Sequence, residues 1–184
     1  EVIIVLSGLT NALRRQTQQR LEAELCRSSI EISERWRILT TDNMDFSGIK
    51  VDPNSDFKSD LTRCQLAIIK KNVSPLKQLI KVLEEIPSSH RRDRRFLFSD
   101  DECDQAGVNA AKDQQVSQDP EEMNRTKINQ LITTLLSLPR RMSYVGYTAT
   151  PYANVFVNSQ DTFDIFPRDF IKLLDAPPIY YGME

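Results

Sequence analysis

Short apolar runs alternate with longer amphipathic stretches along this chain. The apolar runs are rich in β-branched and aromatic residues, so they predict strands, which lie at 2–6, 66–69, 96–98 and 143–147. The amphipathic stretches repeat apolar residues roughly every three to four positions, which is typical of helices. They cover 11–27, 75–86 and 120–138. Strands that alternate with helices predict an α/β fold of three layers, with a parallel sheet between flanking helices.

Capping residues and prolines set the expected helix ends. Thr10 or Asn11 is suited to cap the first helix, and Pro87 ends the second. Ser74-Pro75 and Asp119-Pro120 each offer a cap followed by proline at the first helical position.

The segments between these elements are more polar. Residues 35–39 predict a weak strand, and residues 40–63 predict a long loop or an insertion. Residues 88–95 predict a charged turn, and residues 107–118 a loop.

The charge balance and the length narrow the classes of function. The chain has 184 residues, and its 24 basic and 26 acidic side chains give 24 − 26 = −2. This balance argues against a protein that binds polyanions through bulk charge, although it is compatible with a local basic patch. The longest apolar run, at residues 2–6, is too short to span a membrane.

Cysteine and histidine usage excludes further classes. Cys26, Cys64 and Cys103 form no CxxC pair, which argues against a disulfide framework or a zinc site and favours the reducing cytoplasm. The one histidine, His90, rules out a His-rich metal site.

Acidic residues gather where the strand at 96–98 ends, in the run Ser99-Asp-Asp-Glu-Cys-Asp104. Ligands of parallel sheets bind at the carboxyl ends of the strands. Neighbouring carboxylates repel one another unless a cation offsets their charge. In nucleoside-triphosphate hydrolases one such carboxylate binds Mg²⁺ and another orients the attacking water. A solvated acidic turn is the alternative interpretation.

Two hydroxyls follow the strand at 143–147, in Thr148-Ala-Thr-Pro151. Beside a Mg²⁺–triphosphate site, such hydroxyls can relay the state of the nucleotide to another domain. Alone, the segment is equally typical of a turn that ends in proline, and the acidic run is what makes it informative.

Polar and basic side chains near the ends of the first two long strands are candidates for contacts with a nucleic-acid backbone. A solvated helix face is the alternative for those on the first helix. The basic run at 91–95 precedes its strand, at the opposite edge of the sheet, and is interpreted as a solvated turn. The candidate contact residues are Arg14, Gln16, Thr17, Arg20, Lys70 and Asn72.

These segments together resemble a known family. Asp101-Glu102-Cys103-Asp104 fits the DExD pattern, and Thr148-Ala149-Thr150 fits the Ser/Thr-Ala-Thr pattern of the first RecA-like domain of superfamily-two helicases. The chain more closely resembles the Z-one domain, a family named as endonucleases and found in bacterial restriction and phage-defence proteins. The matching segments are 3–8, 13–20, 69–72, 100–106, 128–129, 144–156 and 166–170.

The resemblance implies a RecA-like fold, ATP and Mg²⁺ as cofactors, and DNA as a partner. It assigns Mg²⁺ binding to Asp101, catalysis to Glu102 and Asp104 in the acidic motif, and the coupling of hydrolysis to movement to Thr148 and Thr150. The implied protein is an ATP-dependent, helicase-like or translocase-like component of a restriction or phage-defence system. Its partners would be further domains of the same protein or other subunits of that system.

One element that this family requires is missing from the sequence. None of the five glycines is followed by Lys and then Ser or Thr, so the phosphate-binding loop GxxxxGK[ST] is absent. The family carries this loop before the segment that matches 3–8. We therefore expect residues 1–157 to be a partial RecA-like core that lacks the phosphate-loop strand on its N-terminal side. Residues 158–184 would be a tail or the start of a connection to the next domain.

The missing strand has an expected consequence for association. It would pair beside the strand at 143–147, so that strand should present an open edge. Open edges invite pairing with another chain, and we expect the chain to self-associate.

Two other functions stay open. Asp56 and Lys58, with Asp42 or Asp45 upstream, loosely fit a metal-dependent endonuclease site. A non-catalytic scaffold that binds partner proteins would also lack the phosphate-binding loop.

Overall fold

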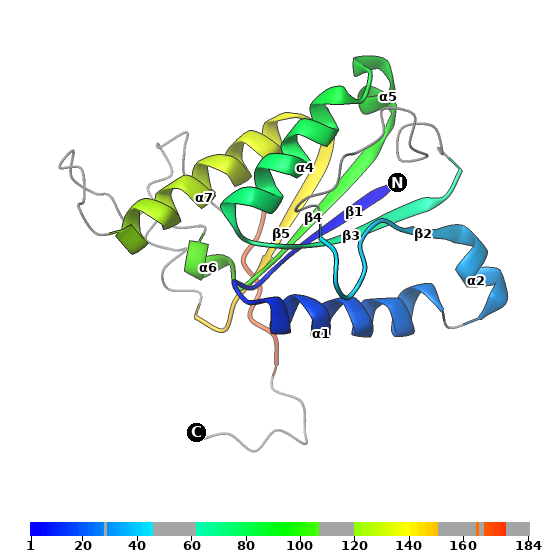
Figure 1. The fold of residues 1–184 in the computed structure, drawn as a ribbon, viewed down its shortest axis with the longest axis horizontal. Coiled ribbons are helices and arrows are strands. Elements are labelled where there is room, and N and C mark those ends of the chain that lie inside the picture. The colour runs from blue at the N-terminus through cyan, green and yellow to red at the C-terminus, as the bar shows by residue number, and fades with distance from the viewer. Residues whose placement is uncertain (28, 46–61, 107–119, 151–164, 166–167, 176–184) are drawn as a thin grey trace.

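The computed structural model describes residues 1–27, 29–45, 62–106, 120–150, 165 and 168–175. These residues form one sheet of five parallel strands with helices packed on both faces (Figure 1). The α/β fold and the parallel sheet predicted from the alternation of elements are therefore confirmed.

The strands lie in the order β2-β3-β1-β4-β5. Their bounds are β1 (Val2–Ser7), β2 (Trp36–Ile38), β3 (Cys64–Lys70), β4 (Arg95–Asp101) and β5 (Arg141–Tyr147). All five predicted strands are present, but β4 runs beyond its apolar residues into the acidic run. Pairing with β5 explains this extension, because the ladder continues through Asp100 opposite Gly146 and Asp101 opposite Tyr147.

The helical elements fill the connections between the strands. They are α1 (Asn11–Leu21), the π-helical turn η1 (Glu22–Cys26), α2 (Ile30–Arg35), α4 (Val73–Glu85), α5 (Ser88–Asp93), α6 (Cys103–Ala106) and α7 (Pro120–Ser137). The three long helices were predicted. The predicted charged turn at 88–95 is wrong in part, because the Arg91 amide bonds the Pro87 carbonyl at 3.0 Å and closes the helical turn of α5.

Two of the expected helix caps fall within the described residues, and the structure confirms one of them. Thr10 caps α1, since its hydroxyl accepts a 3.2 Å hydrogen bond from the Leu13 amide. Ser74 does not cap α4. The cap position belongs to Asn72, which is extended and whose carbonyl accepts the first helical hydrogen bond, from Leu76, at 3.1 Å. Asp119 and the loop predicted at 107–118 lie outside the described residues.

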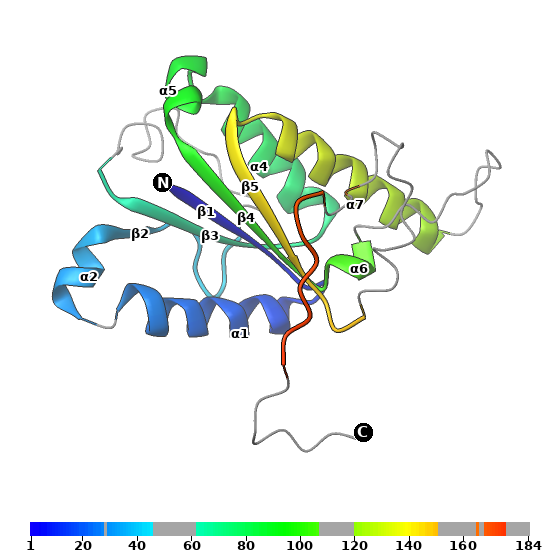
Figure 2. The same ribbon diagram turned by 180° about the vertical axis from the view of Figure 1, so that it is seen from behind.

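Each face of the sheet has its own hydrophobic core. Figure 1 and Figure 2 show α4 and α7 on one face and α1 with α2 on the other. Because successive strand residues point to opposite faces, Ile4, Ile69 and Phe98 pack under α4 and α7, while Val5 and Ile68 pack on the other face. Burial of apolar side chains on both faces is what makes these strands nearly continuous apolar runs.

β5 is an edge strand of the sheet in the described residues. It pairs with β4 on one side and with no other described strand. Met142 and Tyr147 on it are 40% and 53% exposed. The open edge expected at this strand is therefore present in the described part of the chain.

Candidate functional site

The carboxyl ends of β1, β3, β4 and β5 meet at one edge of the sheet, because the strands are parallel. Figure 1 shows α6 and the beginning of α1 at this edge. The acidic run at the end of β4 and the threonines after β5 therefore lie on neighbouring strands, as the sequence indicates.

A buried ion pair lies at this edge. Lys71 Nζ is 2.9 Å from Asp100 Oδ1, and both side chains are 0% exposed. Asp100 Oδ2 accepts a 2.7 Å hydrogen bond from the Tyr144 hydroxyl. Burial raises the pKa of Asp100, and the Lys71 ammonium and the Tyr144 hydroxyl oppose that rise. Removing one partner from such a pair typically costs about 3–5 kcal/mol, because the other charge stays buried.

Strand alternation explains why these side chains meet. Ile69 of β3 and Phe98 of β4 point into the core under α4 and α7. Lys71 and Asp100 follow two positions later and therefore share that face. Lys70 belongs to the opposite face, where its ammonium donates a 2.8 Å hydrogen bond to Asn11 Oδ1. The run Lys70-Lys71-Asn72 was expected to contact a nucleic-acid backbone, but Lys71 is buried, and its spacing from Ile69 is the sequence signal for that burial.

Lys71 also binds the backbone after β4. Its ammonium donates to the Asp101 carbonyl and, at 2.7 Å, to the Glu102 carbonyl. Glu102 has a left-handed backbone, with φ of 54°, the one described non-glycine residue with positive φ. A non-glycine residue in this region costs of order 1–3 kcal/mol and persists only where its surroundings impose it. Here the two carbonyls on either side of the strained residue share one cation.

Gly8 leaves the space that the Glu102 carboxylate occupies. A Cβ on Gly8 would lie 3.1 Å from Glu102 Oε2 and 2.9 Å from Leu13 Cδ1. The Glu102 side chain therefore reaches back over the end of β1, with Leu13 of α1 beside it. Asp101 is exposed at the same edge, so the two carboxylates differ in burial.

Asp104 joins the acidic run to the segment after β5. It accepts a 2.7 Å hydrogen bond from the Thr148 hydroxyl and a second one from the Thr150 hydroxyl. The Thr148 oxygen in turn accepts from the Thr150 amide at 2.9 Å, which closes the turn. Burial tends to raise the pKa of Asp104, but the hydroxyls of Thr150 and Thr148 outweigh it and the pKa lies below its ordinary value.

Cys103 packs against β5 where that strand has no side chain. It is 7% exposed, and a Cβ on Gly146 would lie 2.8 Å from its sulfur and 3.1 Å from its Cβ. Gly146 therefore allows α6 to approach β5 closely. This contact holds the acidic run and the threonine segment at a fixed separation.

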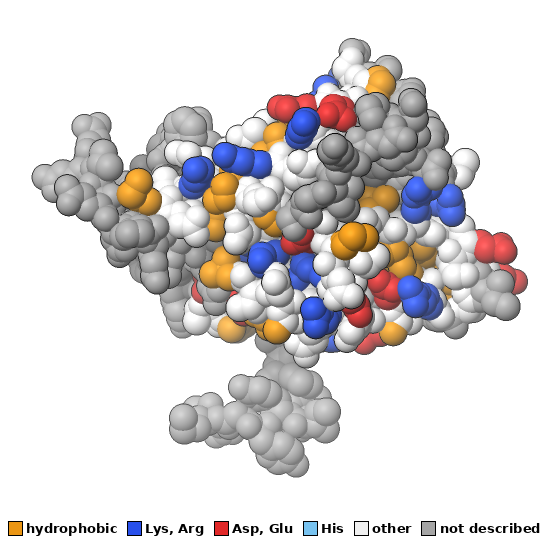
Figure 3. Space-filling model, viewed as in Figure 1, with side chains coloured by type: hydrophobic (Ala, Val, Ile, Leu, Met, Phe, Trp, Pro, Cys, Tyr) orange, Lys and Arg blue, Asp and Glu red, His pale blue; other side chains and the backbone are white. Residues whose placement is uncertain are grey.

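The predicted nucleic-acid contacts divide by exposure. Gln16, Arg20 and Asn72 are exposed, whereas Thr17 and Lys70 are half-buried. Arg14 is 3% exposed, and its guanidinium donates to the Asp42 carbonyl. In this position Arg14 braces the segment after β2 and does not reach the surface, which disagrees with the expected contact. On the side of the molecule seen in Figure 3, which is viewed as in Figure 1, Lys and Arg side chains lie in separate groups, with acidic side chains between some of them.

The endonuclease residues are only partly described. Asp56 and Lys58 lie outside the described residues, and Asp45 is 6% exposed. Within the described ranges, no three Asp, Glu, His or Cys side chains converge as a metal-binding group.

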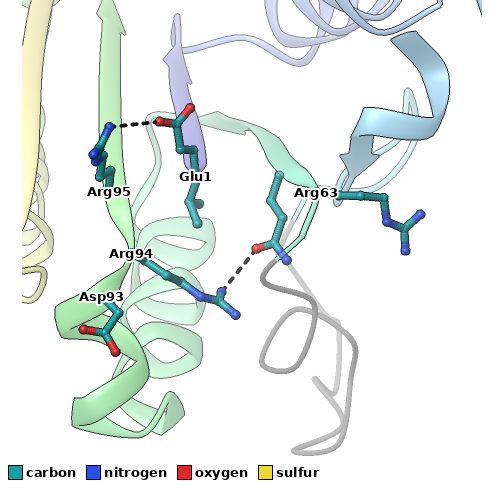
Figure 4. Close-up of a pocket in the computed structure, with 7 residues that line it drawn as sticks. Glu1, Arg63, Asp93, Arg94 and Arg95 are labelled. Carbon is teal, nitrogen blue, oxygen red and sulfur yellow. Dashed lines mark hydrogen bonds and ion pairs between the residues drawn. The ribbon is translucent and has the colours of Figure 1, made fainter. Parts of the chain in front are cut away.

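A hollow of about 240 Å³ lies at the opposite, amino edge of the sheet. Figure 4 shows Arg94 directed at the side chain of Gln65, at 3.3 Å, and Arg95 paired with Glu1 at 3.6 Å. Arg63 is directed away from both pairs. These charges are far along the strands from the acidic run, and they belong to the end of the sheet where parallel sheets rarely bind ligands.

Among the helices that the structure describes, none has the length and apolar character needed to cross a bilayer. Comparisons of the chain with protein-family models, with curated proteins and with solved structures found no match.

Proposed function

We propose that the chain is part of a RecA-like ATPase domain of an ATP-dependent DNA-processing protein, of the kind found in restriction and phage-defence systems. The observation that carries the proposal is the double hydrogen bond from Thr148 and Thr150 to Asp104. It unites the DExD-like and Thr-Ala-Thr segments on adjacent strands. The resemblance of these segments to helicase motifs two and three supports the same interpretation.

The residues present fit a Mg²⁺–nucleotide site. Mg²⁺ usually takes only one or two protein carboxylates, with water and phosphate oxygens for the rest. Asp101 is exposed and would bind the ion, which when bound would neutralise charge on the phosphates. The absence of a three-residue acidic or thiol cluster among the described residues is compatible with such a site.

Glu102 is the proposed residue for orienting the attacking water. Its carboxylate lies next to Gly8, at the end of β1 and away from the Thr148 turn. Such a residue accepts a proton from the nucleophile or orients it, and a positioned base typically contributes 10²–10⁴-fold to a rate. A site of this kind also needs a phosphate-binding loop, and the motif GxxxxGK[ST] does not occur in these 184 residues.

The pair of hydrogen bonds to Asp104 supports a role in coupling. A shift of the acidic run that follows the nucleotide state would change the Asp104 contacts and so move the turn after β5. DNA is the proposed partner, and Gln16, Arg20 and Asn72 are the exposed candidates for its backbone.

Binding of Mn²⁺ with ATP to the chain tests the site. Mn²⁺ replaces Mg²⁺ and broadens the NMR signals of nearby residues, so Asp101 and Glu102 should be affected first. Asp101→Asn should weaken this binding. Asp175→Asn, which removes an exposed carboxylate elsewhere, is the matched control. Broadening that is unchanged by Asp101→Asn would contradict the assignment of the metal to this edge.

A further inference from the structure

We propose that Lys71 is a positioning residue, whose ammonium fixes the backbone at Asp101 and Glu102 and thereby presents the Glu102 carboxylate over Gly8. The role of that carboxylate in orienting water rests on the proposed function, whereas the positioning by Lys71 concerns the described residues alone.

All described contacts of the Lys71 ammonium go to one segment. An ammonium has three N–H donors. Lys71 donates hydrogen bonds to the Asp101 carbonyl and, at 2.7 Å, to the Glu102 carbonyl, and it forms an ion pair with Asp100 Oδ1 at 2.9 Å, all at the end of β4. The side chain is 0% exposed, so it has no accessible surface for a phosphate.

The backbone contacts distinguish positioning from simple charge neutralisation. Any buried ammonium needs acceptors for its remaining N–H groups, so the informative point is which acceptors Lys71 uses. The Asp101 and Glu102 carbonyls belong to the two peptide groups that flank Glu102. Because both must point at the same ammonium, the residue between them is held in its left-handed conformation, with φ of 54°.

The Lys71→Met/Asp100→Asn double variant separates these roles. It removes both buried charges together, so it leaves no unpaired ion, and the amide that replaces the carboxylate could still accept a hydrogen bond from Tyr144. Replacement of a buried pair by neutral groups is often tolerated. If Lys71 positions the backbone, the double variant should fold yet lose the left-handed conformation of Glu102. The Glu102 Cα and Cβ chemical shifts and the HN–Hα coupling, measured by NMR on the labelled chain, report that conformation.

Two controls sharpen the comparison. Tyr144→Phe removes the other partner of Asp100 and keeps Lys71, so the Glu102 signals should keep their left-handed values. Lys77→Met removes an exposed lysine of α4 and should change nothing at Glu102. A left-handed Glu102 in the folded double variant would overturn the proposal.

A measurement on the unaltered chain covers the case in which the double variant does not fold. A buried, hydrogen-bonded ammonium exchanges its protons slowly, so the Lys71 Nζ signal should be visible and correlated with the backbone after β4. A Lys71 ammonium that exchanges as fast as that of Lys77 would also overturn the proposal.

Mn²⁺ binding tests the dependent claim separately. Residues that orient metal-site groups typically change metal affinity 10- to 100-fold, so the double variant should bind Mn²⁺–ATP about tenfold more weakly. If the unaltered chain binds no Mn²⁺ at this edge while Glu102 still moves in the double variant, the proposed function fails and the positioning role stands. If the chain binds Mn²⁺ at this edge and Glu102 stays left-handed in the double variant, the positioning role fails and the proposed function stands.

Discussion

The Thr148 hydroxyl lies 2.7 Å from Asp104 Oδ1 and donates a hydrogen bond to it. These residues are 44 positions apart in the chain and follow adjacent strands. The bond makes the acidic run after β4 and the turn after β5 one polar unit, in which the ionisation of Asp104 depends on the hydroxyls of its neighbours.

Removal of a hydroxyl should raise the pKa of Asp104. The Thr150 hydroxyl stabilises the ionised carboxylate, so Thr150→Val should bring the pKa of Asp104 back towards its ordinary value. A ¹³C NMR titration of the side-chain carboxyl measures this. Thr134→Val removes an exposed hydroxyl of α7 that bonds the Gln130 carbonyl, and it should leave Asp104 unchanged.

The same carboxylate should make stability depend on pH in acid. Its folded pKa lies below its unfolded value of about 3.9, so its contribution is present above that pH and is lost as the pH falls through the folded pKa. Asp104→Asn should therefore be less stable than the unaltered chain at neutral pH, by a margin that shrinks below about pH 4. Urea unfolding across this pH range measures the difference in unfolding free energy between the two chains. A difference that is the same at all pH values would contradict the prediction.

Close packing at Gly146 should make this position intolerant of a methyl group. Gly146→Ala places a Cβ 2.8 Å from the Cys103 sulfur and should destabilise the fold by about 1–3 kcal/mol. Chemical denaturation measures the loss. In the Cys103→Ala background the same substitution should cost clearly less, because the sulfur is gone. Equal costs in both backgrounds would show that the clash is relieved elsewhere.

The open edge of β5 should support self-association. Sedimentation of the chain should show a mass that rises with concentration, since an unpaired parallel edge strand invites another chain. Met142→Lys adds a charge to this strand and should favour the monomer. Met123→Lys, at a similarly exposed methionine on α7, is the control. A monomer at all concentrations would contradict this prediction.

The sequence predicts those parts of the fold that depend on patterns of neighbouring residues. Apolar runs and helical periodicity are local, and they gave the strands, the long helices and the common edge where Asp104 and Thr148 meet. The cap of α4 was missed because Ser74 and Asn72 are both suitable residues, and only the backbone decides between them. The helix α5 was missed because its sequence is charged and has no apolar stripe.

The interior of the site was harder to predict, for a physical reason. A lysine after a strand is usually solvated, so the sequence alone did not indicate that Lys71 is buried. Its burial follows from two facts: it lies on the same face of the sheet as Ile69, and that edge of the sheet is covered. Arg14 was expected at the surface for the same reason, yet it is buried against the Asp42 carbonyl. Burial of charge depends on partners from distant segments, which no local pattern contains.

The most direct test of the central claim is ATP hydrolysis by the protein, with Glu102→Gln compared to Glu31→Gln. Glu31 is an exposed carboxylate of α2, which precedes the amino end of β2 and so lies away from the carboxyl ends of the strands. We expect Glu102→Gln to keep nucleotide binding and to reduce the rate of the hydrolytic step about 10²–10⁴-fold, while Glu31→Gln remains active. Hydrolysis that proceeds at the unaltered rate in Glu102→Gln would contradict the catalytic role of this site.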